Sequence, residues 1–267
     1  MKSPMSNDAL ETHPLDKDSL HTTSLQIDSL QINKALNANV DPAEIAKFEA
    51  MAHRWWDPLG DFRPLHDVNS CRLDYIDSKL PLSGSRIVDI GCGGGILSEA
   101  MARRGASVTG IDMGEAPLQV ARLHALEAGV ELTYLRDSAE NFAASHASAF
   151  DAVTCLEMLE HVPDIYSTIA ACAALVRNGG HLVFSTINRH PEAYALLILG
   201  AEYIANILPR GTHDYTRFIR PSELAAACRA ADLEVRQVTG MRYNPVTRQA
   251  RLSDNVRANY LVHAFKP

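Results

Sequence analysis

Three ionisable side chains stand close together near the middle of the chain, and their types are those that move protons or bind metal ions. Glu157, Glu160 and His161 have i, i+3, i+4 spacing, which would place them on one face of a helical turn. Two chemical interpretations remain open. The three residues could ligate a divalent cation such as Mg²⁺, or His161 could be a general base that the carboxylates orient, with Glu160 as its catalytic partner. A helix N-terminus rich in acids, with a solvated histidine, is the structural alternative.

A glycine-rich segment is the strongest local signal for a binding site. It runs from Asp89 to Ile96 and reads Asp-Ile-Gly-Cys-Gly-Gly-Gly-Ile, so the backbone can approach a ligand closely. A dinucleotide fingerprint would require glycine at position 96 and would disfavour an adjacent carboxylate. Asp89 instead suits a cation, such as the ammonium and sulfonium of a methionyl cofactor. We therefore expect Asp89, Gly91 and Gly93 to bind such a cofactor, and a nicotinamide oxidoreductase is the weaker alternative.

A second acidic position supports this interpretation. Asp112 ends the next expected strand, about 20 residues beyond Gly91, where a carboxylate can accept both hydroxyls of an adenosine ribose. A helix N-cap is the alternative role of Asp112. The segment 137–140, Asp-Ser-Ala-Glu, follows the third expected strand and could either contact the adenine or form a capping box.

From residue 86 onward, short apolar runs alternate with helical stretches, which is typical of a parallel sheet covered on both faces. The expected strands are Ile87–Ile90, Ser107–Ile111, Leu132–Leu135, Ala152–Cys155, His181–Ser185, Glu234–Val238 and Tyr260–Phe265. Further helices are expected at residues 43–53, 70–80, 192–208 and 222–231, with Ser222 as the cap of the last one. The sequence thus predicts an α/β fold, Rossmann-like, with a doubly wound and mostly parallel sheet of about seven strands.

The composition excludes several classes of protein. Acidic side chains outnumber basic ones by 32 to 25, and the formal charge of -7 does not resemble a nucleic-acid-binding protein. The five cysteines are scattered and form no Cys-x-x-Cys pair, so neither a disulfide framework nor a zinc ribbon is indicated. Residues 1–40 contain no Arg and no apolar stretch typical of a signal peptide. We expect a disordered tail there, one folded domain over residues 41–267, and a reducing cytoplasm.

Several segments together resemble a known family. Residues 89–95 resemble the first motif of class I S-adenosylmethionine methyltransferases. The wider match, over roughly residues 41–267, is to the O-methyltransferases of ubiquinone biosynthesis. The segments that carry it are Ile45–Ala50, Arg54–Asp57, Cys155–Val162, Phe184–Arg189 and Gly211–Asp214. Their Trp-Trp-Asp, Glu-Met-Leu-Glu-His and Gly-Thr-His-Asp sequences are far more particular than the glycine motif.

The resemblance implies that the chain methylates polyprenylated ubiquinone precursors, namely 2-polyprenyl-6-hydroxyphenol and 3-demethylubiquinol, with S-adenosylmethionine as the donor. By the same resemblance, Arg72, Gly91, Asp112 and Leu156 match the family's cofactor contacts, and Arg72 would form a salt bridge to the methionyl carboxylate. Two positions depart from the family pattern. Ser70 stands in place of a proline, and Leu156 in place of a methionine, which should preserve an apolar contact. A methyltransferase for another small phenol and a non-catalytic S-adenosylmethionine-binding protein are the functional alternatives.

The stretch 193–208 bears on how a lipid-like substrate would arrive. It is shorter than the about 20 apolar residues that cross a bilayer, and Glu202 and Asn206 interrupt it. Either a buried helix or an interfacial helix that receives a prenyl tail from a membrane is expected there. The protein is thus expected in the cytoplasm, with peripheral membrane contact and other ubiquinone-biosynthesis enzymes as candidate partners. His213 and Asp214 are second-rank candidates for the site chemistry.

Overall fold

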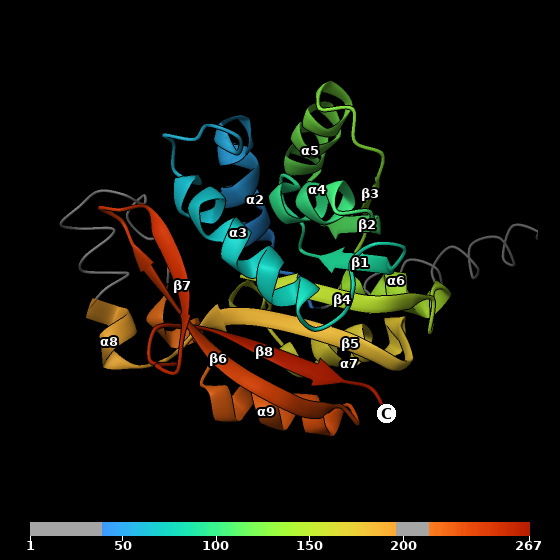
Figure 1. Ribbon diagram of the computed structural model, residues 1–267, viewed down its shortest axis with the longest axis vertical. Helices are drawn as coiled ribbons and strands as arrows, with labels where there is room; N and C mark the ends of the chain where they lie inside the picture. The colour runs from blue at the N-terminus through green and yellow to red at the C-terminus, as the bar shows by residue number, and fades with distance from the viewer. Residues whose placement is uncertain (1–38, 196–213) are drawn as a thin grey trace, which may run out of the picture. The chain divides into compact units, whose positions relative to one another are not determined.

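The apolar runs of the sequence form one mixed β-sheet. The strands are β1 (Arg86–Ile90), β2 (Ser107–Asp112), β3 (Thr133–Arg136), β4 (Phe150–Leu156), β5 (Val176–Ile187), β6 (Glu234–Asn244), β7 (Gln249–Ser253) and β8 (Asn259–Phe265). The computed structural model describes residues 39–195 and 214–267, and within these ranges the sheet has eight strands in the order β3-β2-β1-β4-β5-β8-β6-β7 (Figure 1). In β1 the last four residues are buried. Three of them have branched apolar side chains, which fit a pleated surface covered on both faces.

The order of the strands reverses beside β1, which makes this place the topological switch point of the sheet. Strands β3, β2, β1, β4 and β5 are parallel to their neighbours, whereas β8 lies antiparallel between β5 and β6, and β7 pairs antiparallel with β6. The chain adds β2 and β3 on one side of β1 and then returns to add β4 on the other. Ligands of such sheets bind outside the carboxyl ends of the strands at this reversal. Here those ends are Ile90 and Leu156.

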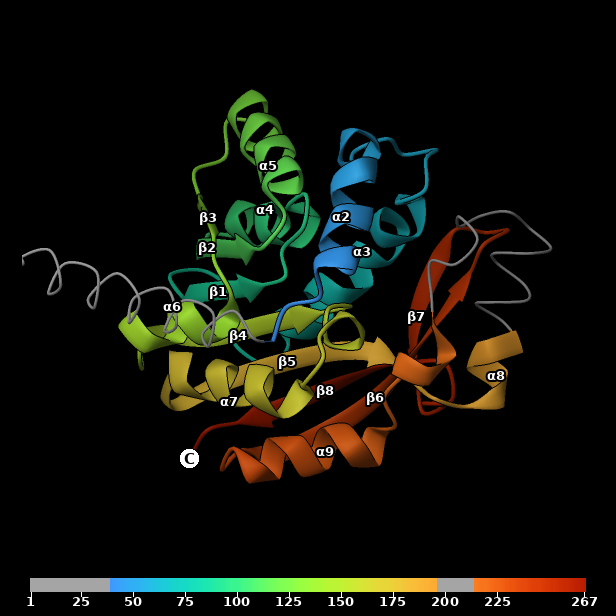
Figure 2. The same ribbon diagram turned by 180° about the vertical axis from the view of Figure 1, so that it is seen from behind.

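Helices cover both faces of the sheet (Figures 1 and 2). They are α2 (Pro42–Met51), α3 (Arg63–Asp77), α4 (Ile96–Arg103), α5 (Glu115–Glu127), α6 (Ala139–Ser145), α7 (Ile165–Leu175), α8 (Pro191–Ala193) and α9 (Pro221–Ala230), with the short turns η1 (Ala52–Arg54), η2 (Leu159–His161) and η4 (Tyr215–Arg217). Val88 belongs to a buried cluster with side chains of α6, α7 and α9, and Ile87 to a cluster with α3 and α4. These adjacent residues of β1 pack in opposite layers because successive side chains of a strand point to opposite faces.

The sheet differs from the sequence prediction by one strand. The eighth strand, β7, pairs only with β6 at the edge of the sheet. Its residues are exposed or half-buried, and it contains the polar Gln249 and Arg251. It therefore lacks the apolar alternation by which a strand is recognised in a sequence.

Some helix boundaries also differ from the prediction. Helix α3 begins at Arg63 rather than near residue 70. Ser222 does not cap α9, because Pro221 already occupies the first helical position, which suits a residue that has no backbone N–H. Apart from α8, the helix predicted over 192–208 lies outside the described residues. Among the helices that are described, none is long and apolar enough to cross a membrane.

Candidate active site

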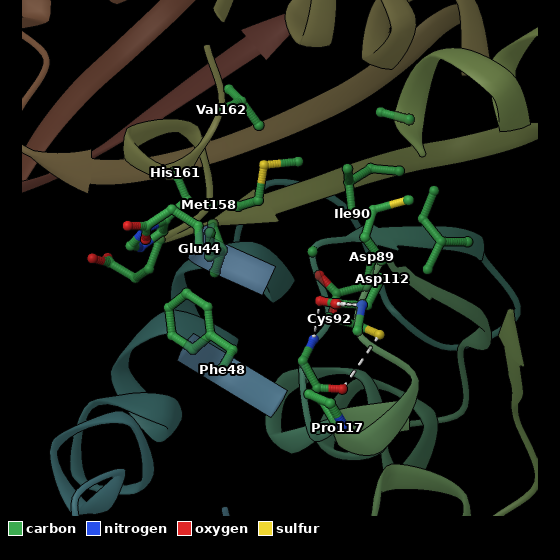
Figure 3. Close-up of a pocket in the computed structure, with 18 of the residues that line it drawn as sticks. Glu44, Phe48, Asp89, Ile90, Cys92, Asp112, Pro117, Met158, His161 and Val162 are labelled. Atoms are coloured by element: carbon green, nitrogen blue, oxygen red, sulfur yellow. Dashed lines mark hydrogen bonds and ion pairs between the residues drawn. The ribbon is translucent and has the colours of Figure 1, made fainter. Parts of the chain in front are cut away.

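A cavity lies at the switch point, where the carboxyl ends of β1, β2 and β4 meet (Figure 3). Helix α2, which precedes the sheet in the sequence, lines it with three of its side chains. The residues labelled on one side of the cavity are Glu44, Phe48 and His161, and those on the other are Asp89, Cys92 and Asp112 (Figure 3). Helix α2 begins at Pro42, one residue before the predicted start, and Oδ1 of its N-cap Asp41 accepts a hydrogen bond from the backbone N–H of Ala43. The site thus combines a sheet edge with an N-terminal helix.

The glycine-rich segment forms the turn from β1 to α4. Gly91, Gly93 and Gly95 have φ angles of +71°, +53° and +86°, a region that residues with a Cβ rarely adopt. A Cβ on Gly93 would lie 2.2 Å from Cζ2 of Trp55, and Trp55 is stacked on Phe62 with ring centroids 4.0 Å apart. Because Gly93 has no side chain, the indole of Trp55 can pack directly against the turn. This turn borders the cavity.

Asp112 lines the cavity at the end of β2. Its two oxygens accept hydrogen bonds from the backbone N–H groups of Gly93 at 2.9 Å and Gly114 at 2.8 Å. Burial raises the pKa of this carboxyl group. Asp112 is not the N-cap of α5, because that position is Gly114. Each carboxylate oxygen has a further lone pair, so Asp112 retains acceptor capacity for the hydroxyls of a ribose.

Asp89 also borders the cavity, but its oxygens have partners within the protein. They accept hydrogen bonds from Oγ of Ser98 at 2.6 Å and Oγ1 of Thr154 at 2.7 Å. The residue is 3% exposed, and burial raises its pKa to about 6. A cation brought into the cavity would favour the ionised form. Asp89 thus fixes the start of the turn to α4 and β4, and its contact with a cofactor cation stays a prediction.

Arg72 and Glu157 form an ion pair inside the cavity. Nη2 of Arg72 lies 2.5 Å from Oε1 of Glu157, and Oγ of Ser185 donates to the same carboxylate oxygen at 2.8 Å. Arg72 is 7% exposed, and its Nε is buried without a hydrogen-bond partner among the described residues. An unused donor on a buried guanidinium is costly unless a ligand satisfies it. This arrangement fits the implied role of Arg72 in binding a carboxylate.

His161 lines the cavity from η2 and is paired with a carboxylate of α2. Its Nδ1 lies 2.6 Å from Oε2 of Glu44, and its ring packs edge-on against Phe48 with centroids 5.0 Å apart. The hydrogen bond with His161 holds the pKa of Glu44 below its ordinary value. A carboxylate at Nδ1 keeps the imidazole proton on that nitrogen and leaves Nε2 as an acceptor. His161 therefore has the arrangement of an oriented general base.

Glu160 does not line the cavity. It is 4% exposed, and Oγ1 of Thr186 donates to its Oε2 at 2.8 Å. Burial, together with the neighbouring charge of Glu157, raises the pKa of Glu160 to about 7. The predicted helical face of Glu157, Glu160 and His161 is wrong, because Glu157 has a φ of +52° that a right-handed helix cannot include. The turn η2 begins only at Leu159.

A metal site is not assembled from the predicted ligands. In the described part of the chain, no group of three or more His, Cys, Asp or Glu side chains is arranged to hold a metal ion. Each predicted ligand instead has another partner: Glu157 faces Arg72, Glu160 faces Thr186 and His161 faces Glu44. In this arrangement the three side chains bind other protein groups, and their role as metal ligands stays a prediction.

Comparisons with known proteins show the family of this chain. A family model described as a methyltransferase domain matches residues 66–238. A ubiquinone biosynthesis O-methyltransferase of Stutzerimonas stutzeri is 60% identical over 229 residues, which are 86% of this chain and 99% of the relative. That of Aromatoleum aromaticum is also 60% identical over 229 residues, with 86% and 98% covered. The chain belongs to the ubiquinone biosynthesis O-methyltransferases. It is therefore an S-adenosylmethionine-dependent enzyme that methylates oxygen.

Solved structures show the fold of this O-methyltransferase independently. An S-adenosylmethionine-dependent methyltransferase of Thermotoga maritima has a TM-score of 0.61 at 19% identity, and the match covers 82% of this chain and 98% of that one. Magnesium protoporphyrin IX methyltransferase of Synechocystis PCC 6803 has a TM-score of 0.57 at 20% identity, with 78% and 85% covered. These likenesses confirm the predicted class I methyltransferase fold.

The structure places the remaining predicted residues of the O-methyltransferase site as follows. Leu156 ends β4 and lines the cavity. Asp137 and Ser138 line it as well, and Ser138, rather than Asp137, caps α6. Asp214 caps the short turn η4 and does not border the cavity, whereas His213 lies outside the described residues.

Sequence reasoning missed three residues of the O-methyltransferase site, all before the sheet. Glu44 pairs with a residue 117 positions away, and Trp55 covers the glycine turn. Asn39 lines the cavity. Its Nδ2 donates a hydrogen bond to Oε1 of Glu140 at 2.8 Å, and its Oδ1 accepts one from the backbone N–H of Asp164 at 2.7 Å. The Trp-Trp-Asp segment could have pointed to Trp55, whereas nothing in the sequence links Glu44 or Asn39 to their distant partners.

Proposed function

We propose that the enzyme transfers the methyl group of S-adenosylmethionine to the catechol-type hydroxyl of polyprenylated ubiquinone precursors, with His161 as the general base. The substrates are 2-polyprenyl-6-hydroxyphenol and 3-demethylubiquinol. The single observation that carries the mechanism is the 2.6 Å contact between Nδ1 of His161 and Glu44 at a cavity bordered by the glycine turn. Membership in the family supports the acceptor class.

The cofactor is held by residues of α3, β2, β4 and the turn from β1 to α4. Arg72 binds the methionyl carboxylate through its unused Nε, Asp112 accepts the ribose hydroxyls, and the backbone of Gly91 and Gly93 borders the methionyl chain. Leu156 adds an apolar contact at the end of β4. When bound, S-adenosylmethionine supplies an electrophilic methyl group. Because transfer requires an in-line nucleophile held close, positioning by these residues contributes much of the rate.

The acceptor must lose a proton for its oxygen to attack. A phenol has an ordinary pKa of about 10, so it is largely protonated at neutral pH. Nε2 of His161 takes the hydroxyl proton, while Glu44 holds the ring orientation and stabilises the imidazolium that forms. The ion pair of Glu157 with Arg72 keeps this neighbouring carboxylate from competing as a base.

A divalent cation remains the second candidate for activating the hydroxyl, because adjacent phenolic oxygens form a natural chelate. The predicted ligands are Glu157, Glu160 and His161, which would have to leave their present partners. Cytoplasmic location, peripheral membrane contact through residues 193–208, and association with other ubiquinone-biosynthesis enzymes also belong to this proposal. Flotation with vesicles that contain anionic lipids tests the membrane contact.

Methyl transfer from labelled S-adenosylmethionine to a short-chain demethylubiquinol, with and without a chelator, tests the proposal. Transfer that is indifferent to the chelator supports His161 as the base. Transfer that the chelator abolishes and Mg²⁺ restores supports the acceptor but replaces the base with a cation. Binding of S-adenosylmethionine without any transfer would overturn the proposed acceptor, and a catechol without a prenyl tail should then be assayed.

A further inference from the structure

A second cleft opens beside the active-site cavity. It is bordered by η2, the first turn of α7, η4 and the start of α9. Two of its lining residues, Asp41 and Val162, line the active-site cavity as well. The two spaces are therefore neighbours that share these residues as a common wall.

The inner wall of the second cleft is apolar. Leu159, Phe218 and Ile219 are 1%, 1% and 4% exposed, so they form the packed floor of the cleft. Its accessible apolar surface comes from Val162, Pro163, Ile165 and Tyr166. Ile165 and Tyr166 follow at the start of α7, and Tyr166 is 49% exposed. A path thus leads along apolar side chains from Val162 to an aromatic ring at the surface of the molecule.

The charged residues of the second cleft neutralise one another. Nη2 of Arg217 lies 2.7 Å from Oδ2 of Asp41, and Arg189 is paired with Glu223. An anionic ligand would have to compete with a carboxylate that already pairs with each of these two guanidinium groups. The cleft consequently favours an uncharged ligand over a phosphate or a carboxylate.

The position of Val162 connects this apolar path to the chemistry. Val162 directly follows His161 in the chain, and both line the active-site cavity. The second cleft is therefore the neighbouring space toward which an acceptor would extend past Val162 when its hydroxyl lies at His161. We infer that the second cleft binds the first isoprene units of the acceptor's tail. This inference rests on the proposed function, and it makes the cleft the element that distinguishes prenylated from simple phenols.

Tail-length dependence of methyl transfer tests the inference. The acceptors are water-soluble demethylubiquinols with no tail and with two isoprene units, assayed with the wild-type enzyme, Tyr166→Glu and the control Val246→Glu. Tyr166 lies in the first turn of α7, where an added acid is compatible with the helix, so the variant should fold. Val246 is an apolar residue, 89% exposed, outside both cavities. The variant Tyr166→Ser removes apolar area without adding a charge.

We expect kcat/KM of the wild-type enzyme to rise by about tenfold or more from the tail-less to the tailed acceptor, because the added carbons are removed from water. In Tyr166→Glu most of this ratio is lost, chiefly through KM for the tailed acceptor. Tyr166→Ser should lose less, and Val246→Glu should keep the wild-type ratio. A wild-type ratio in both Tyr166 variants would overturn the inference. If the wild-type enzyme methylates neither acceptor, the proposed function fails instead.

Discussion

Nδ1 of His161 and Oε2 of Glu44 lie 2.6 Å apart, although 117 residues separate them in the chain. We predict that Glu44→Gln lowers kcat by about tenfold with little change in KM for S-adenosylmethionine, because an amide can accept the hydrogen bond but cannot stabilise an imidazolium. Glu44→Asp should recover part of the loss. Steady-state kinetics on both variants measure this effect.

Glu127→Gln is the matched control for this change in charge. Glu127 is exposed at the end of α5, so its replacement should leave kcat unaltered. An unchanged kcat in Glu44→Gln would show that the contact with His161 is structural and that another group takes the proton.

Gly93 and Gly84 both have a positive φ, so alanine at each position tests whether a loss of binding comes from backbone strain or from the contact with Trp55. Gly93 and Gly84 have φ angles of +53° and +79°, but a Cβ on Gly93 would collide with Trp55, whereas a Cβ on Gly84 would meet nothing within 4 Å. We expect Gly93→Ala to weaken S-adenosylmethionine binding by at least about thirtyfold and Gly84→Ala to leave it intact. Gly84→Ala should lose about 1 kcal/mol of stability from its left-handed backbone alone, and Gly93→Ala should lose more because Trp55 must also move. Calorimetric titration and thermal melts distinguish the outcomes, and equal affinities would refute a role for the Trp55 contact.

Replacing Arg72 with lysine tests carboxylate binding while the positive charge at this position is kept. Arg72→Lys keeps an ion pair with Glu157 within reach but removes the Nε donor that has no partner among the described residues and the planar fork that suits a carboxylate. The dissociation constant of S-adenosylmethionine should rise by about tenfold. Arg86→Lys, at a position with 60% side-chain exposure, should have no effect. Equal affinities of the two variants would remove Arg72 from the cofactor site.

The buried carboxyl of Glu160 should make stability depend on pH. Its pKa is raised from 4.5 to about 7, so the folded state favours the protonated acid. This stabilisation is fully present below about pH 4.5 and is lost as pH rises through about 7. Relative to Glu160→Gln, we expect the wild-type protein in chelator to lose up to about 3 kcal/mol of unfolding free energy between pH 4.5 and 8.5.

Urea unfolding at several pH values measures this difference, and Glu131→Gln, at an exposed position, serves as the control with a flat profile. Recovery of the lost stability when Mg²⁺ is added at pH 8.5 would contradict the metal-free arrangement, since a bound cation would hold Glu160 in its ionised form.

The parallel core of the fold could be predicted because its signals are local. The apolar runs at Ile87–Ile90 and Ser107–Ile111 coincide with β1 and β2 to within a residue, and the glycines between them fall in the turn. Strand β7 was inaccessible to the same reasoning, because an edge strand with Gln249 and Arg251 carries no apolar alternation.

The candidate site was predictable in its components but not in its pairings. Asp112 and His161 both border the cavity, and their roles in cofactor binding and catalysis stay predictions. The spacing of Glu157 and His161 suggested a helical turn, but the left-handed φ of Glu157 rules that turn out. A glutamate in a sequence gives no indication that its backbone will be left-handed. Glu44 was missed because apolar periodicity and capping residues predict only where a helix forms. They do not predict which distant side chain will contact that helix.

The contact of Trp55 with the glycine turn has a consequence for how far the protein can be trimmed. The region matched by the methyltransferase family model, residues 66–238, excludes Trp55 and Glu44, and it also excludes β8, which fills the sheet between β5 and β6. Excision at those limits would uncover the turn, remove the partner of His161 and leave a gap in the sheet. The region that the family model matches is thus smaller than the set of residues that builds the site, and fragments of this enzyme should keep the segment with Glu44 and Trp55 and strand β8 as well.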